Sequence, residues 1–206
     1  MRRRSTWMII IGILLLLAAG GLVFRNMQES AEAGEASDSA LTGLEEAMPS
    51  EDAWSIALPT LPEEGTEMTT VEVDGYTYIG RLEIPSLELS LPVMKDWDYN
   101  KLNISPCRYS GSYLSDDMVI CAHNFASHFG SIHTLAIGAE VDFITTEGRV
   151  YRYSVSNIET LQPTMVSEMM GLDEDLLVDE EKGWELTLFT CTVDGRARHA
   201  VRCIRQ

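Results

Sequence analysis

The sequence predicts a mainly β domain, folded as an antiparallel sandwich or a closed barrel and preceded by one transmembrane helix. Three observations lead to this fold class. An uncharged, apolar run extends over residues 7–24. From Val71 onward, short segments rich in β-branched and aromatic residues alternate with turn signals. That region also lacks the spacing of long amphipathic helices, so we expect its segments to pair as strands.

The composition limits the classes of protein to consider. The 206 residues are 45% hydrophobic, which suits one packed domain and an additional segment. Acids outnumber bases 32 to 15, for a formal net charge of −17. Nucleic-acid-binding proteins present a basic face, so we exclude nucleic acid as a partner. The charge is uneven, because residues 1–25 hold four arginines and no acid, whereas residues 26–74 hold 13 acids and no base.

Residues 1–25 are predicted to form a cytoplasmic stub and a transmembrane anchor. The run over 7–24 would span about 27 Å as a helix, close to the hydrocarbon core of about 30 Å. The arginines at 2–4 are expected to stay in the cytoplasm, so that the following domain is extracellular. A cleaved signal peptide is the alternative. The uncleaved anchor is favoured because the Ala-Glu-Ala at 31–33 lies well beyond the apolar run.

Residues 26–70 are predicted to form an acidic, flexible tether. This segment is rich in Glu, Ala, Ser, Thr and Pro and shows no sustained apolar period. Such a composition favours a solvated chain that lifts the domain off the membrane. Residues 41–48 are the one stretch in which a short helix is expected.

Residues 71–206 are predicted to form the globular domain. Glu147-Gly148 and Asp194-Gly195 each lie between two apolar segments, as in β-hairpins. Helical patterns are confined to short stretches at 132–135 and 164–170. The segments expected to form strands are 76–84, 87–93, 118–122, 141–145, 149–155, 186–190 and 199–204.

A thiol, an imidazole and a guanidinium stand at the ends of predicted strands. Cys191 follows the strand at 186–190, and His123 follows the strand at 118–122. Arg198 begins the next strand after Cys191, with six residues between them, so an antiparallel hairpin would bring the two together. From the pattern alone, a Cys–His–Arg site and ordinary strand-end residues both remain open.

The other cysteines carry a weaker signal. Cys121 and Cys203 are most simply small core residues. A disulfide among Cys107, Cys121, Cys191 and Cys203 stays open, because extracellular cysteines can pair. A zinc site is not expected, since the chain has no C-x-x-C motif.

Three segments resemble the motifs of sortases, in the order found in that family. They are GRLEIPSLELSLPV at 80–93, VICAHN at 119–124 and LTLFTC at 186–191, the last followed by Arg198. The histidine motif is usually written with Gly before His, where this chain has Ala122. The resemblance extends over roughly 76–204. It implies a closed, mostly antiparallel β-barrel of about eight strands.

The resemblance also implies an activity. Sortases are membrane-anchored cysteine transpeptidases, with a first step like that of a thiol protease. They cut surface proteins at a C-terminal LPxTG-like sorting signal through a thioester and pass them to an amine, commonly of a cell-wall precursor or peptidoglycan. By position, Cys191 would be the nucleophile and His123 the general acid and base. Arg198 would stabilise the oxyanion or orient the substrate.

Three further residues follow from the same comparison. Thr190 and Asn124 flank the catalytic positions and are expected to support substrate binding. Arg196 is the rival for the arginine, and Arg198 is preferred because the residues after it read as the strand that follows the family arginine. His199 in that strand departs from the more apolar family pattern.

Cofactor and subclass are expectations of the same kind. No cofactor is expected to be required. The acidic segment at 171–185 suggests calcium, although its spacing is not that of an EF-hand and a solvated loop is the simpler interpretation.

The subclass is predicted from two missing features. No second apolar run follows the domain, and no Asp-Pro-aromatic lid motif precedes it. Asp96-Trp97-Asp98 resembles such a motif only superficially. These features favour a cell-wall-anchoring type over a pilin-polymerising type.

Three other kinds of protein share some of these features. An L,D-transpeptidase also has His before Cys, but its Ser-His-Gly-Cys context is absent here. A papain-like cysteine peptidase would have the reverse order. The third is an anchored, non-catalytic binding domain, against which the full set of Cys191, His123 and Arg198 argues.

Overall fold

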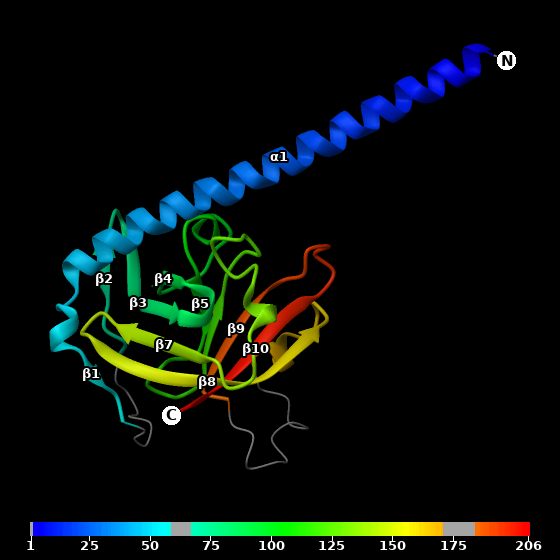
Figure 1. Ribbon diagram of the computed structural model, residues 1–206. Helices are drawn as coiled ribbons and strands as arrows, with labels where there is room; N and C mark the ends of the chain where they lie inside the picture. Colours follow the sequence, from blue (N-terminus) through cyan, green and yellow to red (C-terminus); the bar gives the residue numbers. More distant parts are fainter. Residues whose placement is uncertain (1, 59–66, 171–183) are drawn as a thin grey trace.

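A closed β-barrel forms the body of the protein. The computed structural model describes residues 2–58, 67–170 and 184–206. Eight strands close the barrel in the order β3-β4-β5-β6-β9-β10-β8-β7, with β7 pairing back to β3 (Figure 1). Their bounds are β3 Tyr76–Ile84, β4 Leu89–Met94, β5 Cys107–Ser110, β6 Met118–Cys121, β7 Glu140–Thr145, β8 Arg149–Leu161, β9 Leu186–Cys191 and β10 Arg198–Arg205.

The closed ring decides between the two architectures that the pattern left open. A sandwich would leave two separate sheets, whereas here every barrel strand has a partner on both sides. The pairings are antiparallel except β4 with β5 and β6 with β9. Two short strands lie outside the ring: β1 (Ser55–Ile56) runs parallel to β8, and β2 (Val71–Val73) forms a hairpin with β3. The predicted mainly β, mostly antiparallel barrel is confirmed.

Alternation along the strands fills the barrel interior. Side chains from opposite walls, such as Phe143 of β7 and Leu188 of β9, are fully buried in one continuous core. Gly148 and Gly195 end the expected hairpin turns with φ of +78° and +70°, values that favour glycine because it has no Cβ. β8 is longer than predicted, and β5 was not predicted at all. The strand β5 is four residues long and includes Arg108 and Ser110, whereas the equally short β6 is a continuous apolar run that the sequence does reveal.

Within the described residues of the body, helical structure is confined to short pieces. The expected helical stretches appear as η4 (Ile132–Thr134), a 3₁₀ turn, and α2 (Val166–Met169). Three further 3₁₀ turns are η1 (Glu51–Ala53), η2 (Pro85–Leu87) and η3 (Lys101–Asn103). The acidic segment considered for calcium falls almost entirely within 171–183, outside the described residues.

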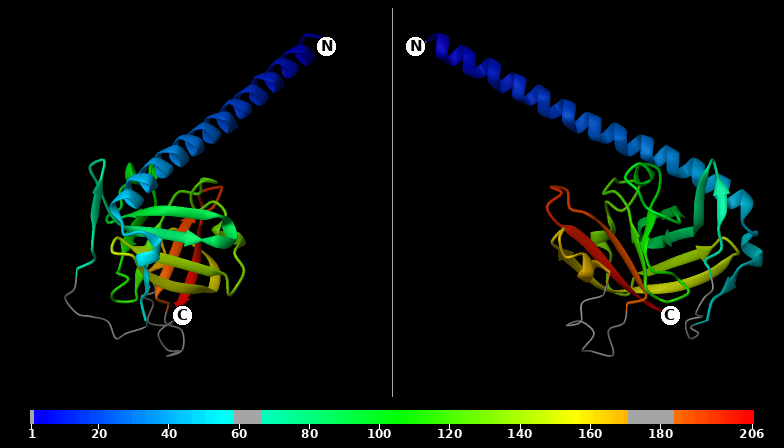
Figure 2. Two further views of the ribbon diagram at one scale, coloured as in Figure 1. Left: turned by 60° about the vertical axis from the view of Figure 1, so that its left-hand side comes forward. Right: turned by 180° about the vertical axis from the view of Figure 1, so that it is seen from behind.

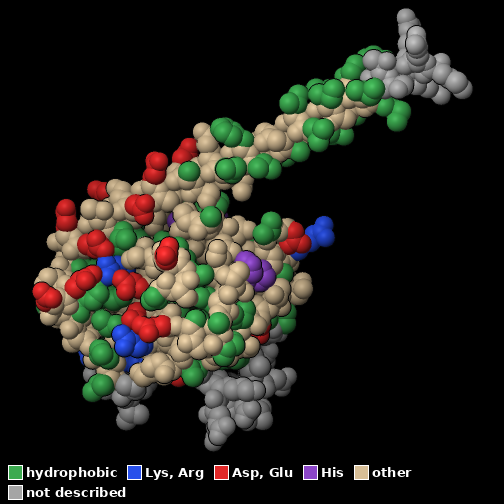
Figure 3. Space-filling model, in the orientation of Figure 1, with side chains coloured by type: hydrophobic (Ala, Val, Ile, Leu, Met, Phe, Trp, Pro, Cys, Tyr) green, Lys and Arg blue, Asp and Glu red, His purple; other side chains and the backbone are tan. Residues whose placement is uncertain are grey.

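The N-terminal helix α1 (Arg2–Ala47) is much longer than the predicted anchor. Its apolar first part projects from the barrel with its side chains exposed, and its second part lies along the barrel (Figures 1 and 2). Acidic side chains begin where the helix reaches the body (Figure 3). By length and composition this helix could cross a membrane. An N-terminal signal sequence would have the same properties.

The structure differs from the predicted tether over 26–47, which is helical and docked rather than extended. The docked face repeats at helical spacing but consists mainly of small or polar residues, so hydropathy did not reveal it. A further part of the segment, β1, pairs with β8. The buried residues of the docked face are Ala33, Ser37, Ala40, Leu44 and Met48.

Candidate active site

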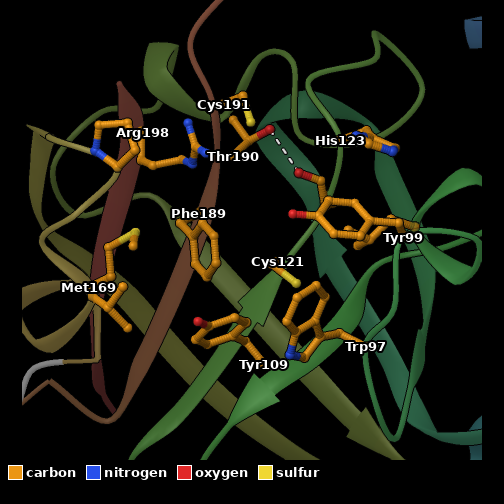
Figure 4. Close-up of a pocket in the computed structure, with 14 residues that line it drawn as sticks. Trp97, Tyr99, Tyr109, Cys121, His123, Met169, Phe189, Thr190, Cys191 and Arg198 are labelled. Atoms are coloured by element: carbon orange, nitrogen blue, oxygen red, sulfur yellow. Dashed lines mark hydrogen bonds between the residues drawn. The ribbon is translucent and has the colours of Figure 1, made fainter. Parts of the chain in front are cut away.

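A pocket of about 230 Å³ opens where β6 and β9 end side by side. Cys191, His123 and Arg198 all line it, although they come from three separate segments of the chain. Figure 4 shows Cys191 between Arg198 on one side and His123 on the other. The remaining lining residues are Trp97, Tyr99, Leu102, Tyr109, Cys121, Ala122, Pro163, Val166, Met169, Phe189 and Thr190.

The β9–β10 hairpin brings the thiol and the guanidinium together. Arg198 and Cys191 are direct partners in the antiparallel register, as the six-residue spacing predicted. Arg198 Nη1 donates hydrogen bonds to the carbonyls of Gly195, at 3.3 Å, and Ala197, at 2.9 Å. The rival, Arg196, belongs to the turn, where its backbone N–H donates to Asp194, and it does not line the pocket. The structure therefore brings Arg198, and not Arg196, to Cys191.

His123 lies in the loop that follows β6. Its ring packs against Phe125 with the ring centroids 4.9 Å apart, and it points away from Cys191 (Figure 4). His123 and Cys191 are both described by the structure, and no hydrogen bond joins them. Partial burial lowers the pKa of His123, which favours the neutral imidazole. A neutral imidazole is the form that can take a proton from a thiol.

The two flanking polar residues bond to the scaffold. The buried Thr190 hydroxyl donates to the Ala122 carbonyl at 2.9 Å, which joins β9 to the end of β6 (Figure 4). Asn124 Nδ2 donates to the Thr192 carbonyl at 3.3 Å, which joins the His123 loop to the residue after Cys191. These bonds hold the segments that carry Cys191 and His123. Substrate binding by Thr190 and Asn124 stays a prediction.

Comparison with known proteins adds the family. A family model described as the sortase domain matches residues 82–205, more than half of the chain. The chain belongs to the sortase family. No curated protein sequence matches it.

Solved structures share the sortase barrel. Sortase C1 from Streptococcus suis is 28% identical, with a TM-score of 0.51, and the match covers 63% of this chain and 73% of that one. Sortase C from Clostridium perfringens is 22% identical, with a TM-score of 0.50, and the match covers 63% and 70%. Sortase D5 from Clostridium perfringens is 16% identical, with a TM-score of 0.51, and the match covers 63% and 79%. These similarities establish the fold, while the predicted cell-wall-anchoring subclass stays a prediction.

An aromatic wall forms one side of the pocket in this sortase. Trp97 lies 5.4 Å from Tyr109 and 5.6 Å from Tyr99, measured between ring centroids, and Tyr109 meets Phe189 edge-on at 5.3 Å. Arg108 supports this wall by donating to the Lys95 carbonyl and to Asp96, next to Trp97. Sequence reasoning missed the wall. Aromatic residues within the polar loop at 95–100 were the only available signal.

The remaining cysteines of this sortase are unpaired. Cys107, Cys121 and Cys203 are buried free thiols, in agreement with the core interpretation of Cys121 and Cys203. Burial raises the pKa of Cys107 and Cys203 to about 12, which keeps these thiols protonated. No group of three metal-ligating side chains occurs within the described parts of the chain. Cys191 is the partly exposed cysteine among the four.

Proposed function

We propose that this sortase is a cysteine transpeptidase that cuts surface proteins at an LPxTG-like C-terminal sorting signal and joins them to an amine. The acceptor class is a cell-wall precursor or peptidoglycan amine. The observation that carries the proposal is the convergence of Cys191, His123 and Arg198 on one pocket. The aromatic wall beside them suits an extended peptide with apolar residues.

The first half of the reaction forms a thioester. His123 takes the proton of the Cys191 thiol, and the thiolate attacks the carbonyl carbon of the Thr that precedes Gly in the signal. Free Cys titrates near ~8.5 and free His near ~6.5, so the unassisted proton transfer has an equilibrium constant of about 0.01. The C–N bond then breaks, and the leaving amine takes a proton from the His123 imidazolium.

The second half releases the product. The acceptor amine attacks the thioester carbonyl and gives a proton to His123, and the Cys191 thiolate leaves. Arg198 is permanently charged and faces the thiol across the hairpin, so it stabilises the thiolate and the oxyanion that forms in each half. His123 must turn from Phe125 toward Cys191 for either transfer, because catalytic hydrogen bonds often tighten only when substrate is bound. No cofactor enters this scheme.

We further propose that α1 is an uncleaved, single-pass anchor with a cytoplasmic N-terminus and an extracellular barrel. The exposed apolar side chains over 7–24 need a lipid environment, and the arginines at 2–4 favour the cytoplasmic side. The helix continues without interruption to the body. Residue 33, which contacts the barrel, is about 14 Å along the helix axis from residue 24. The active site would therefore operate close to the membrane surface.

The test uses the full chain in lipid nanodiscs with a library of sorting peptides and a triglycine acceptor. Mass spectrometry should detect a thioester on Cys191 and the transpeptidation product. Cys191→Ala should abolish both, whereas Cys203→Ala removes a core thiol and should retain both. Arg198→Lys is expected to lower turnover about 10- to 100-fold, while Arg196→Lys leaves it unchanged. Turnover by Cys191→Ala would refute the mechanism, and an inert wild-type chain would favour a binding domain.

A further inference from the structure

The docked part of α1 contacts the loop that carries His123. Ser127 Oγ, within this loop, donates a hydrogen bond to the Ser30 carbonyl at 3.0 Å. One turn further along the helix, the backbone at Gly34 also lies close to Ser127. A Cβ atom built on Gly34 would lie 3.2 Å from the Ser127 Cβ, which is tighter than ordinary van der Waals contact. Glycine at this position therefore lets the helix and the loop pack closely, and a larger side chain would push them apart.

Two aromatic rings lie behind this contact. His128 is fully buried, and the backbone of Ala33 on α1 and of Ile104 lies beside its ring. The Phe125 ring centroid lies 5.8 Å from that of His128. Phe125 also borders a hollow together with Glu29, Glu32 and Ala33 of the helix. Phe125 and the helix thus lie on the same hollow, and Phe125 is the residue against which His123 packs.

The loop between these contacts is a compact unit. The backbone N–H groups of His128 and Gly130 both donate to the Phe125 carbonyl, and that of Phe129 donates to the His123 carbonyl. A side chain on Gly130 would meet the Phe125 carbonyl at 2.7 Å, so the turn has no spare space. Asn124 ties the other end of the loop to Thr192, beside Cys191. Because the loop is this compact, we expect a displacement at the helix to be transmitted to His123, which lies next to Asn124.

We propose that α1, besides its role as an anchor, is a positioning element of the active site. Through Ser30 and Gly34 it holds Ser127, and with it the loop that sets the distance from His123 to Cys191. This inference rests on the proposed function. An error of about 1 Å in the placement of a catalytic group can cost about 100-fold in rate. The contact would thus support the chemical step rather than the affinity for substrate.

The experiment compares matched glycine variants of the full chain in nanodiscs. Gly34→Leu forces the helix and the loop apart, whereas Gly21→Leu makes the same change on the same helix where nothing lies within 4 Å. Ser127→Ala is a milder variant that removes only the bond to the Ser30 carbonyl. We expect Gly34→Leu to lower kcat for thioester formation about 10- to 100-fold with KM within about two-fold. Ser127→Ala should lower kcat a few-fold, and Gly21→Leu should match the wild type.

A second readout separates positioning from a loss of folding. In the His123→Cys background, the rate of disulfide formation between residue 123 and Cys191 under mild oxidation depends on the distance between the two positions. We expect Gly34→Leu to slow this cross-link several-fold, while Gly21→Leu leaves its rate unchanged. An unchanged kcat in the enzyme assay, or a lower kcat with an unchanged cross-linking rate, would overturn the inference. The cross-link forms without any peptide, so it tests positioning even if no sorting peptide reacts. A failure of every sorting peptide to react would reject the proposed function alone.

Discussion

We expect the buried His128 to make the stability of this sortase depend on pH. The ring is fully buried, and neither nitrogen has a hydrogen-bond partner among the described residues. Burial, with a smaller contribution from His123, lowers its pKa from 6.5 to about 4, although the backbone of Ala33 and Ile104 opposes the shift. Because folding depresses this pKa, the neutral ring contributes fully above pH 6.5. The contribution is lost as the pH falls from 6.5 toward 4.

The magnitude follows from proton linkage between the two pKa values. Lowering the pH from 7.5 to 5.0 protonates His128 in the unfolded chain but leaves it largely neutral in the folded one. The free energy of unfolding should therefore fall by about 2 kcal/mol from this residue alone.

Urea unfolding of the full chain and of His128→Phe, each at pH 7.5 and 5.0, isolates this contribution. Phe has a ring of similar size and does not titrate. The other titrating groups are the same in both proteins, so the difference between their pH-dependent losses of stability is due to His128. We expect the wild type to lose about 2 kcal/mol more than His128→Phe between the two pH values. Equal losses in the two proteins would show that His128 keeps an ordinary pKa, and would refute the reasoning.

Two further predictions concern other parts of the barrel. Trp97→Ala should raise KM for a sorting peptide about 5- to 50-fold in a steady-state assay, with little change in kcat. The reason is that Trp97 forms part of the aromatic wall and is not one of the reacting groups. In the same assay, Tyr99→Ala should raise KM less, because it removes a largely exposed ring. A fall in kcat alone would contradict this. Arg202→Leu should lower the free energy of unfolding by about 3–5 kcal/mol in urea titrations. The reason is that the buried guanidinium binds Glu159, Thr187 and the Met169 carbonyl. A loss below about 1 kcal/mol would contradict this prediction.

Much of the candidate site could be anticipated from local sequence. A strand, a polar turn and a second strand fix the register of a hairpin, so the pairing of Arg198 with Cys191 follows from six intervening residues. His123 could be placed at a strand end, but not beside Cys191. That proximity depends on the parallel pairing of β6 with β9, which joins segments 68 residues apart, as the bond from Thr190 to Ala122 records. Only the family motifs supplied this link in advance.

The aromatic wall escaped prediction for a different reason. Trp97 and Tyr99 lie in an irregular loop, where no periodicity tells a pocket residue from an exposed one. Their position depends on Arg108, whose hydrogen bonds to Lys95 and Asp96 come from the neighbouring strand β5. Those contacts exist only once β4 and β5 are side by side.

The sequence by itself determined the apolar helix, the mainly β domain and the residues able to do cysteine chemistry. These properties depend on composition and on short-range spacing, which the chain carries locally. The tertiary structure alone decided that the barrel closes and that residues 26–47 continue the helix onto the barrel instead of forming a tether. The docked face is built from small residues such as Ala33, Gly34 and Ser37, whose importance lies in how closely two backbones approach. Close approach depends on the shape of the opposing surface, and that surface exists only in the folded protein.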